Sequence, residues 1–374
     1  MRRPSPVRYP RLGGHASGVF YSGGGIPGNS HLIVRHSTFT GGRAAIGSTR
    51  GSAGRPASRI DIHDNRFSGQ RSADDVASNF AVQVNHSDAT IRNNVFTDCG
   101  VRCINAGGVL QVLDNQLSQC GTAVCVAAFG QASARIAGNH MSNVIAGEYD
   151  SWFHHVIFVH NTQAIIEDND IDGCGFGQCI TANVRANGDM RNNRITVRHG
   201  ERTRIGIVLS DNQGGDAEET DRGGSFRLTG NVLIGVGGNA DAEPDNPDAY
   251  PFTIGAFVNE GHSTMTAVGN TVTGANYGFI TRTGSVLEGT QNTLSSLRVG
   301  VGTFANAGPT NLNWNDILAF RAFDLVTQEG TDITCNWWGG APSNYFGEPD
   351  PSTYTPWANQ PVAATGTGQC TGGL

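Results

Sequence analysis

The sequence predicts an all-β solenoid, a single stack of about 11 to 12 coils built from short parallel strands. The main observation is the motif aliphatic-x-x-Asn-x-apolar, which returns about every 21 to 24 residues over the regular parts of the chain. A repeat of this length is typical of folds in which each unit packs only on its neighbours. The asparagines of the motif are Asn65, Asn94, Asn115, Asn139, Asn169, Asn193, Asn231, Asn270, Asn292, Asn315 and Asn336.

The residues around each asparagine alternate as they do in a strand that ends in a bend. The residue two positions after it is apolar, and the residue three positions before it is almost always aliphatic; Gly289 is the exception. A unit of about 22 residues holds three short strands, so successive coils would stack about 4.8 Å apart. Because asparagine tolerates a left-handed φ, we expect it to form the bend. We also expect its amide to hydrogen-bond to the asparagines of neighbouring coils.

These repeats resemble those of pectate-lyase-like and copper-maturation-type (NosD-like) periplasmic proteins, and the resemblance covers residues 19–357. It implies a right-handed parallel β-helix, the hand that the crossover rule also favours. The sequence Cys-Asn-Trp-Trp-Gly at 335–339, with the later Pro-Trp at 356–357, is similar to the ending of many bacterial and archaeal extracellular β-helix proteins. We expect these aromatic residues to close the last coil, and a sugar-binding platform is the alternative.

The expected organisation is therefore a single solenoid with two additions. It comprises an N-terminal extension (1–18), the β-helix (19–334) and a C-terminal cap (335–374).

Composition narrows the range of functions. The chain has 374 residues, a net charge of −7 and no lysine, which excludes lysine-dependent lyase mechanisms, Schiff bases and phosphate-binding loops that need lysine. Without a basic stripe, nucleic acid is not an expected partner. No apolar run is long enough to cross a membrane. We expect a monomer.

Eight cysteines indicate an oxidising compartment. Cys99, Cys120 and Cys174 each lie five residues after a motif asparagine, and a second cysteine follows each of them by four or five residues. A bridge between Cys120 and Cys174 would span two coils, about 9.6 Å, which is too far. The predicted bridges are Cys174–Cys179, Cys120–Cys125 and Cys335–Cys370, with Cys99–Cys103 and Cys99–Cys120 as alternatives to each other and free buried thiols as the alternative to all.

The expected location is extracellular, periplasmic or on the cell surface. Residues 1–6 are not followed by the apolar segment of a secretion signal, so we expect export although this chain carries no such signal.

Three intervals between asparagines are longer than the rest. The chain takes 30 residues from Asn139 to Asn169, 38 from Asn193 to Asn231 and 39 from Asn231 to Asn270. The additional residues must leave the stack as loops, and loops of this kind often carry binding sites. We therefore expect a groove between residues 144 and 256.

An exposed charged group is predicted beside these loops. On neighbouring coils, the outward positions place Glu167 beside Arg191 and Asp189 beside Arg227. Two carboxylates and two guanidinium groups are able to act as acid, base or charge clamp on a glycan. The alternative is a pair of exposed ion pairs that contribute little.

Two further groups of candidates lie nearby. Asp168, Asp170 and Asp172 match the first half of a calcium loop, but position twelve is Cys179 rather than glutamate, so turn carboxylates are the alternative. The predicted sugar-binding residues are Tyr149, Trp152, His154, His199 and Arg202.

Two functional hypotheses follow. The first is a secreted or cell-surface protein that binds polysaccharide or serves as a surface scaffold, because no complete catalytic signature is present. The second is a polysaccharide lyase or glycoside hydrolase that acts on an acidic glycan in the groove between residues 144 and 256. The fold alone does not decide between them.

Overall fold

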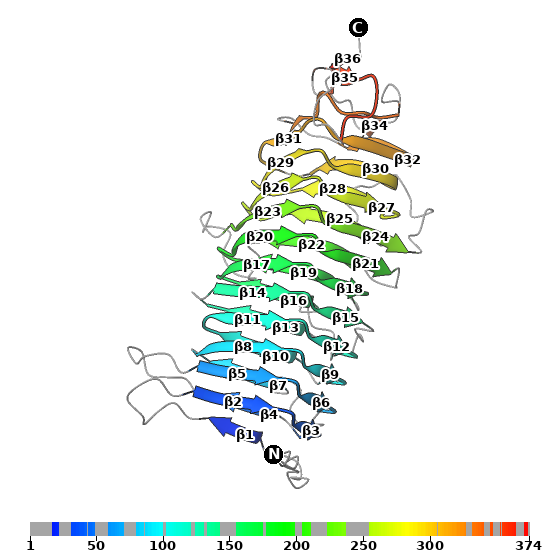
Figure 1. The fold of residues 1–374 in the computed structure, drawn as a ribbon. Coiled ribbons are helices and arrows are strands. Elements are labelled where there is room, and N and C mark those ends of the chain that lie inside the picture. Colours follow the sequence, from blue (N-terminus) through cyan, green and yellow to red (C-terminus); the bar gives the residue numbers. More distant parts are fainter. Residues whose placement is uncertain are drawn as a thin grey trace. The chain divides into compact units, whose positions relative to one another are not determined.

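The computed structural model describes residues 17–21, 31–42, 44–48, 59–70, 80–85, 87–99, 102–120, 124–130, 133–142, 155–174, 177–198, 204–210, 223–236, 254–304, 306–326, 331–339, 345–346, 352, 354–363 and 370–372. The chain forms two compact units, Met1–Gly175 and Phe176–Leu374. Each unit is a parallel β-helix, which confirms the predicted all-β solenoid (Figure 1). The described residues contain no α-helix. They therefore include no helix long and apolar enough to span a membrane.

In the first unit, each coil contributes a first strand before the motif asparagine, a second strand after it and a third strand further on. The first strands are β2 (His31–Arg35), β5 (Arg59–His63), β8 (Asp88–Arg92), β11 (Leu110–Leu113), β14 (Ser133–Ala137) and β17 (Gln163–Glu167). The second strands are β3 (Thr38–Thr40), β6 (Arg66–Ser68), β9 (Val95–Thr97), β12 (Gln116–Ser118), β15 (His140–Ser142) and β18 (Asp170–Asp172). The third strands are β1 (Ser17–Tyr21), β4 (Ala44–Ser48), β7 (Phe80–Asn85), β10 (Arg102–Gly107), β13 (Val124–Phe129) and β16 (His155–His160).

The second unit repeats this arrangement. Its first strands are β20 (Asn187–Arg191), β23 (Ser225–Thr229), β26 (Thr264–Val268), β29 (Val286–Thr290), β31 (Thr310–Leu312) and β33 (Thr331–Asp332). Its second strands are β21 (Arg194–Arg198), β24 (Val232–Val236) and β27 (Thr271–Thr273), and its third strands are β19 (Gln178–Asn183), β22 (Arg204–Ser210), β25 (Ile254–Asn259) and β28 (Tyr277–Thr281). The long strands β30 (Thr293–Thr303) and β32 (Asp316–Val326) serve as second and third strands together.

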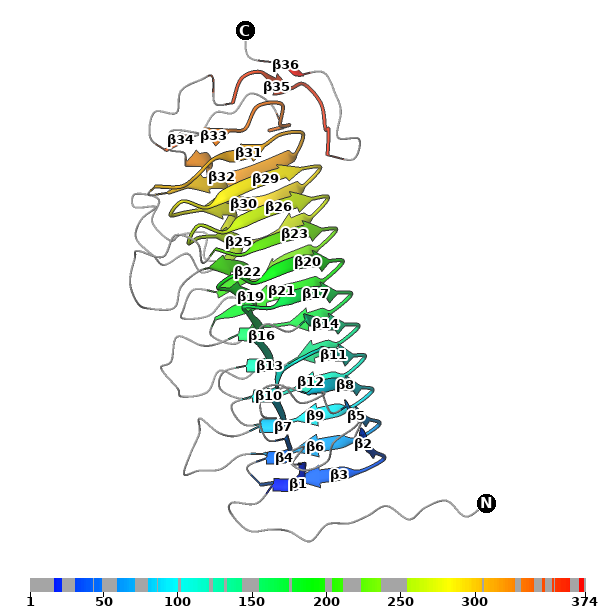
Figure 2. The same ribbon diagram turned by 90° about the vertical axis from the view of Figure 1, so that its left-hand side faces the viewer.

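Within each unit, equivalent strands of successive coils pair in parallel and in register (Figure 2). Because side chains alternate across a strand, one set points inward and forms the core. On the second strands, Phe39, Phe67 and Phe96 stack with ring centroids 5.0 and 4.7 Å apart. Aliphatic residues fill the same inward positions elsewhere, which explains the apolar residue two positions after each asparagine.

The motif asparagines form a buried ladder in each unit. In the first unit, the backbone N and the Nδ2 of Asn65 both donate to Asn94 Oδ1, and the same two bonds recur up to Asn169. In the second unit they recur from Asn193 to Asn336, at 2.8 to 3.1 Å over both units. The predicted side-chain ladder is therefore present. Ser37 takes the asparagine position in the first described coil, and its backbone N donates to Asn65 Oδ1.

The expectation that the motif asparagine adopts the left-handed conformation is wrong, because the residue before it does so instead. The positive φ belongs to the residue before each ladder asparagine, where it lies between 52° and 66°. That residue turns outward at the bend, whereas the asparagine points inward and uses its whole amide for hydrogen bonds. Hydrogen bonding explains why the inward residue is asparagine, and the left-handed φ limits which residue types precede it.

The C-terminal segment packs on the last ladder coil. The backbone N of Ala358 donates to Asn336 O at 3.0 Å, and the backbone N of Cys335 donates to Pro356 O at 2.7 Å. The strand β35 (Trp357–Ala358) then pairs antiparallel with β36 (Cys370–Gly372). Trp338 is buried, in line with an end-closing role for this aromatic residue.

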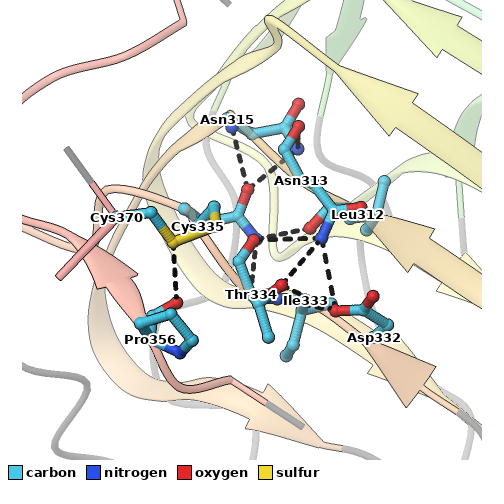
Figure 3. The surroundings of a disulfide bond; sticks show 10 residues. Leu312, Asn313, Asn315, Asp332, Ile333, Thr334, Cys335, Pro356 and Cys370 are labelled. Carbon is cyan, nitrogen blue, oxygen red and sulfur yellow. Dashed lines mark hydrogen bonds between the residues drawn. A yellow bond between two sulfur atoms is a disulfide. The ribbon is translucent and has the colours of Figure 1, made fainter. Parts of the chain in front are cut away.

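Disulfides are present in both units. The structure joins Cys99 to Cys103, Cys120 to Cys125 and Cys335 to Cys370, all of which are pairings that the sequence predicts. Cys174 and Cys179 are disulfide-bonded as well, so none of the eight cysteines, all within the described residues, is free. The Cys335–Cys370 bridge ties the C-terminal segment to the last described ladder coil (Figure 3).

Candidate functional site

Glu167, the first of the predicted catalytic carboxylates, is held by an arginine of the preceding coil. It ends β17, and both Nε and Nη2 of Arg135 on β14 lie 2.7 Å from its Oε1. The glutamate is 9% exposed. Charge-assisted bonds of this kind hold the carboxylate in place and give it a structural role that the sequence did not indicate.

The other three predicted catalytic residues belong to the second unit. Asp189 on β20 and Arg227 on β23 are directly opposite each other in the parallel pairing, and Arg191 lies opposite Thr229. The predicted register between Asp189 and Arg227 is thus present. Among the residues that the structure describes, however, no ion pair joins their side chains, and Arg227 is exposed. Opposite charges therefore lie side by side on neighbouring first strands without bonding to each other.

The aspartates of the proposed calcium loop are separated by the bend. Asp168 occupies the left-handed position before Asn169, while Asp170 and Asp172 lie on β18, with buried Ile171 between them. Asp170 Oδ2 lies 3.1 Å from His140 Nδ1 of the neighbouring coil. Within the described part of the chain, no three acidic, histidine or cysteine side chains are arranged to hold a metal ion.

The predicted sugar-binding residues lie outside the part of the chain that the structure describes. They are Tyr149, Trp152, His154, His199 and Arg202, and most residues of the three predicted loops lie outside it as well.

A groove that the sequence did not predict lies on the outward side of the first strands in the second unit. Its volume is about 540 Å³. It runs across the coils that carry β26, β29, β31 and β33, and it ends beside the Cys335–Cys370 disulfide. It is lined by Thr266, Val268, Glu288, Gly289, Thr290, Asn311, Asn313, Trp314, Asp332, Thr334 and Cys335.

One column of polar side chains crosses the groove. Thr266, Glu288, Asn311 and Asp332 are successive partners in the parallel pairing, so their side chains project from the same surface. Glu288, Asn311 and Asp332 are exposed. Because successive coils lie about 4.8 Å apart, the two carboxylates are attached to backbone positions about 9.6 Å apart, with Asn311 between them.

A hydrogen-bond network orders the end of the groove next to the disulfide (Figure 3). Asn313 Nδ2 donates to Asp332 Oδ1 at 3.2 Å and to Thr334 Oγ1 at 3.1 Å. Asp332 Oδ1 also accepts from Thr334 N at 3.1 Å and from Thr334 Oγ1 at 2.9 Å. The side chains of Asp332, Asn313 and Thr334 are therefore held in place before any ligand binds.

Trp314 contributes the only aromatic side chain among the residues that line the groove. It occupies the position before the ladder residue Asn315, with a φ of 60°. The equivalent position elsewhere holds aspartate, asparagine, glycine, glutamine or cysteine. A bulky residue is costly in this conformation, by about 1 to 2 kcal/mol relative to glycine. A strained aromatic residue in a polar groove is typical of a functional position.

An aromatic cluster on the third strands of the first unit was also missed. It consists of Phe80, Arg102, Phe129, His155, Phe158 and His160. The Arg102 guanidinium lies 5.9 Å from the centre of the Phe80 ring and 5.3 Å from that of Phe129. Burial lowers the pKa of Arg102 and also that of His160. In this part of the structure, neither Arg102 Nε nor His160 Nδ1 has a hydrogen-bond partner.

Comparison with protein-family models, with curated proteins and with solved structures gives no match to this chain.

Proposed function

We propose that this protein is an extracellular β-helix protein that binds polysaccharide in the groove lined by Trp314, Asn313 and Asp332. The observation that carries the proposal is Trp314, which places an indole ring in a preformed polar groove against its own backbone preference.

The groove has the groups that a sugar needs. A pyranose ring presents apolar C–H faces and polar hydroxyl edges. An indole ring offers a flat apolar surface for the face, and carboxylate, amide and hydroxyl groups bond the edges. The groove supplies both kinds of group within one surface, from Trp314 and from Glu288, Asn311 and Asp332. It is also open along the coils, which suits a chain-like ligand that continues beyond the site.

The extracellular location rests on the disulfides. Disulfides within single coils and across the C-terminal segment persist in oxidising compartments and are rare in the cytosol. The repeat and the Asn-Trp-Trp-Gly ending resemble those of extracellular and periplasmic β-helix proteins, which supports the same location.

The test compares Trp314→Asn with Trp314→Phe. Asparagine suits the left-handed position but removes the ring, whereas phenylalanine keeps an aromatic face. Wild-type protein is screened on a panel of neutral, amine-bearing and uronic-acid oligosaccharides, and the affinity of each variant for the bound glycan is measured by calorimetry. We expect Trp314→Asn to lose at least about tenfold in affinity and Trp314→Phe to retain most of it. Wild-type protein that binds no glycan, or a Trp314→Asn variant with unchanged affinity, would overturn the proposal.

A second candidate function rests on the register between Asp189 and Arg227. A lyase or hydrolase that acts on an acidic glycan would use these residues with Arg191 as acid, base or charge clamp. Incubation with uronic-acid polymers and detection of shortened or unsaturated products tests it. Turnover that Arg191→Ala abolishes would support the enzyme, and stable binding without any product would exclude it for the polymers tested.

A further inference from the structure

We infer that the groove discriminates glycans by charge, so that it binds chains with free amino groups most tightly, uncharged chains less tightly and uronic-acid chains least. The inference rests on the proposed function, and it names the class of glycan that the same groove would take.

The charge of the groove is the first argument. Its lining includes two carboxylates, from Glu288 and Asp332, and no arginine or histidine. The chain has no lysine, so arginine and histidine are the only side chains able to neutralise these carboxylates. Along the same column, the nearest arginine is Arg227, which pairs with Thr266 at the far end of the groove. The groove therefore presents two negative charges to a ligand.

The availability of the carboxylates is the second argument. Glu288 is exposed, and within the described residues its side chain forms no hydrogen bond or ion pair. In Asp332, the Asn313 and Thr334 side chains and the Thr334 backbone all bond to Oδ1, so Oδ2 is left for a ligand. A protonated amine is a donor of three hydrogen bonds and is attracted by both carboxylates, whereas a hydroxyl gains only the hydrogen bond.

The arrangement of the carboxylates is the third argument. Glu288 and Asp332 are separated by the coil that carries Asn311, so a glycan that lies along the column passes both charges. A uronic-acid chain carries a negative charge on each sugar and would bring like charges together at both positions. Because the groove is open to solvent, this repulsion is screened and lowers affinity without forbidding contact.

The same geometry keeps the acidic glycan of the second candidate function out of this groove. Its positive partners, Arg191 and Arg227, do not line this groove, so a uronic-acid polymer would have to bind elsewhere on the first strands. The two sites are therefore distinguishable by ligand charge.

The experiment uses three oligosaccharides of equal length: a glucosamine oligomer, its fully N-acetylated form and a galacturonic-acid oligomer. Calorimetric titration is done on the full chain in low salt, at a pH that keeps amines protonated and carboxylates ionised. We expect the glucosamine oligomer to bind about tenfold more tightly than the N-acetylated form, and the galacturonic-acid oligomer to bind most weakly. The advantage of the amine should shrink when salt is raised, because exposed charges are screened.

The matched variants are Glu288→Gln and Asp88→Asn. Both remove one exposed carboxylate from a first strand, but Asp88 lies on β8 of the first unit and does not line the groove. We expect Glu288→Gln to remove most of the preference for the amine while affinity for the N-acetylated oligomer stays within about twofold, and Asp88→Asn to change neither.

The outcomes separate the two proposals. If no oligosaccharide binds, the proposed function fails. If they bind with equal affinity, or if the galacturonic-acid oligomer binds most tightly, the function stands and the charge selection is wrong. A preference for the amine that survives Glu288→Gln together with Asp332→Asn would also overturn the inference.

Discussion

Two adjacent columns of residues meet at the same bend of every coil, and they differ in chemistry. The inward column is asparagine in every copy from Asn65 to Asn336, and each of these side chains is at most 1% exposed. The outward column, one residue earlier, shares only a positive φ, and its residue types vary from coil to coil. The inward column is constrained by hydrogen bonds on both sides, whereas the outward column is constrained only by backbone conformation.

This difference separates stability from function. A residue that bonds to the coils above and below cannot change without leaving buried groups unpaired. The outward position is free to change, and in the second unit it holds Trp314 in the groove and Cys335 in the disulfide. Functional groups are therefore expected where a repeat departs from its own pattern at an outward position.

Breaking the asparagine ladder should have the largest effect on the free energy of unfolding. In Asn292→Leu, Ala267 O loses its donor and the Asn270 backbone N loses its acceptor, while Asn315 Oδ1 loses one of its two donors. Unsatisfied buried groups cost about 1 to 3 kcal/mol each, so we expect about 3 to 6 kcal/mol less stability in urea unfolding. The control is Gln291→Asn, which changes the outward neighbour to a residue that suits its φ and should change stability by less than about 0.5 kcal/mol. Equal losses in the two variants would contradict the division between the columns.

Removing the Cys335–Cys370 disulfide, which begins in the outward column, should have the next largest effect on stability. Replacing Cys335 and Cys370 together by serine opens a link between residues 35 apart in sequence, and loop-closure entropy predicts a loss of about 3 to 4 kcal/mol. The control replaces Cys99 and Cys103, which are four residues apart, and should cost about 2 kcal/mol. Thermal unfolding under non-reducing conditions measures both. A larger loss for the short link would show that local packing, rather than chain entropy, dominates.

Relieving the strained turn should have a small effect of the opposite sign. Asparagine at position 314 fits the left-handed backbone, so Trp314→Asn should raise the unfolding free energy by up to about 1 kcal/mol while it weakens glycan binding. Urea unfolding of wild type and variant measures the change. A loss of more than about 1 kcal/mol would mean that the indole ring supports the fold.

The fold was predictable because the repeat fixes both its period and its inward face. The position of the bend was misassigned by one residue, since the sequence shows an invariant asparagine but not whether bonding or conformation makes it so. The candidate site was sought where intervals between asparagines lengthen, whereas the groove is lined mostly by residues between Asn270 and Asn336, where the intervals are regular. Spacing therefore carried no signal there. The available signal was Trp314, an aromatic residue at a position that elsewhere holds small or polar residues.

The partner of Glu167 was also not predictable from the repeat. The sequence predicts Glu167 beside Arg191, whereas the guanidinium of Arg135 reaches Glu167 from the preceding coil. A long side chain selects among several neighbours within reach, and register alone does not determine which one it bonds.

The smallest predicted effect concerns the pH dependence of stability at a buried polar atom that has no hydrogen-bond partner. No side-chain atom of a ladder asparagine lacks a partner among the described residues, whereas His160 Nδ1 in the aromatic cluster does.

Burial lowers the pKa of His160, so the folded state binds its proton less readily than the unfolded state. Stability is therefore fully present above the unfolded pKa of about 6.5 and is lost as pH falls through the folded pKa. Arg102 and His155 are the other titratable groups that face the same cluster in the described residues. We expect the unfolding temperature to drop between pH 7 and pH 5, and His160→Phe, which keeps an aromatic ring beside Phe129 and Phe158, to reduce that drop. An identical pH dependence in wild type and variant would mean that His160 stays solvated enough to titrate normally.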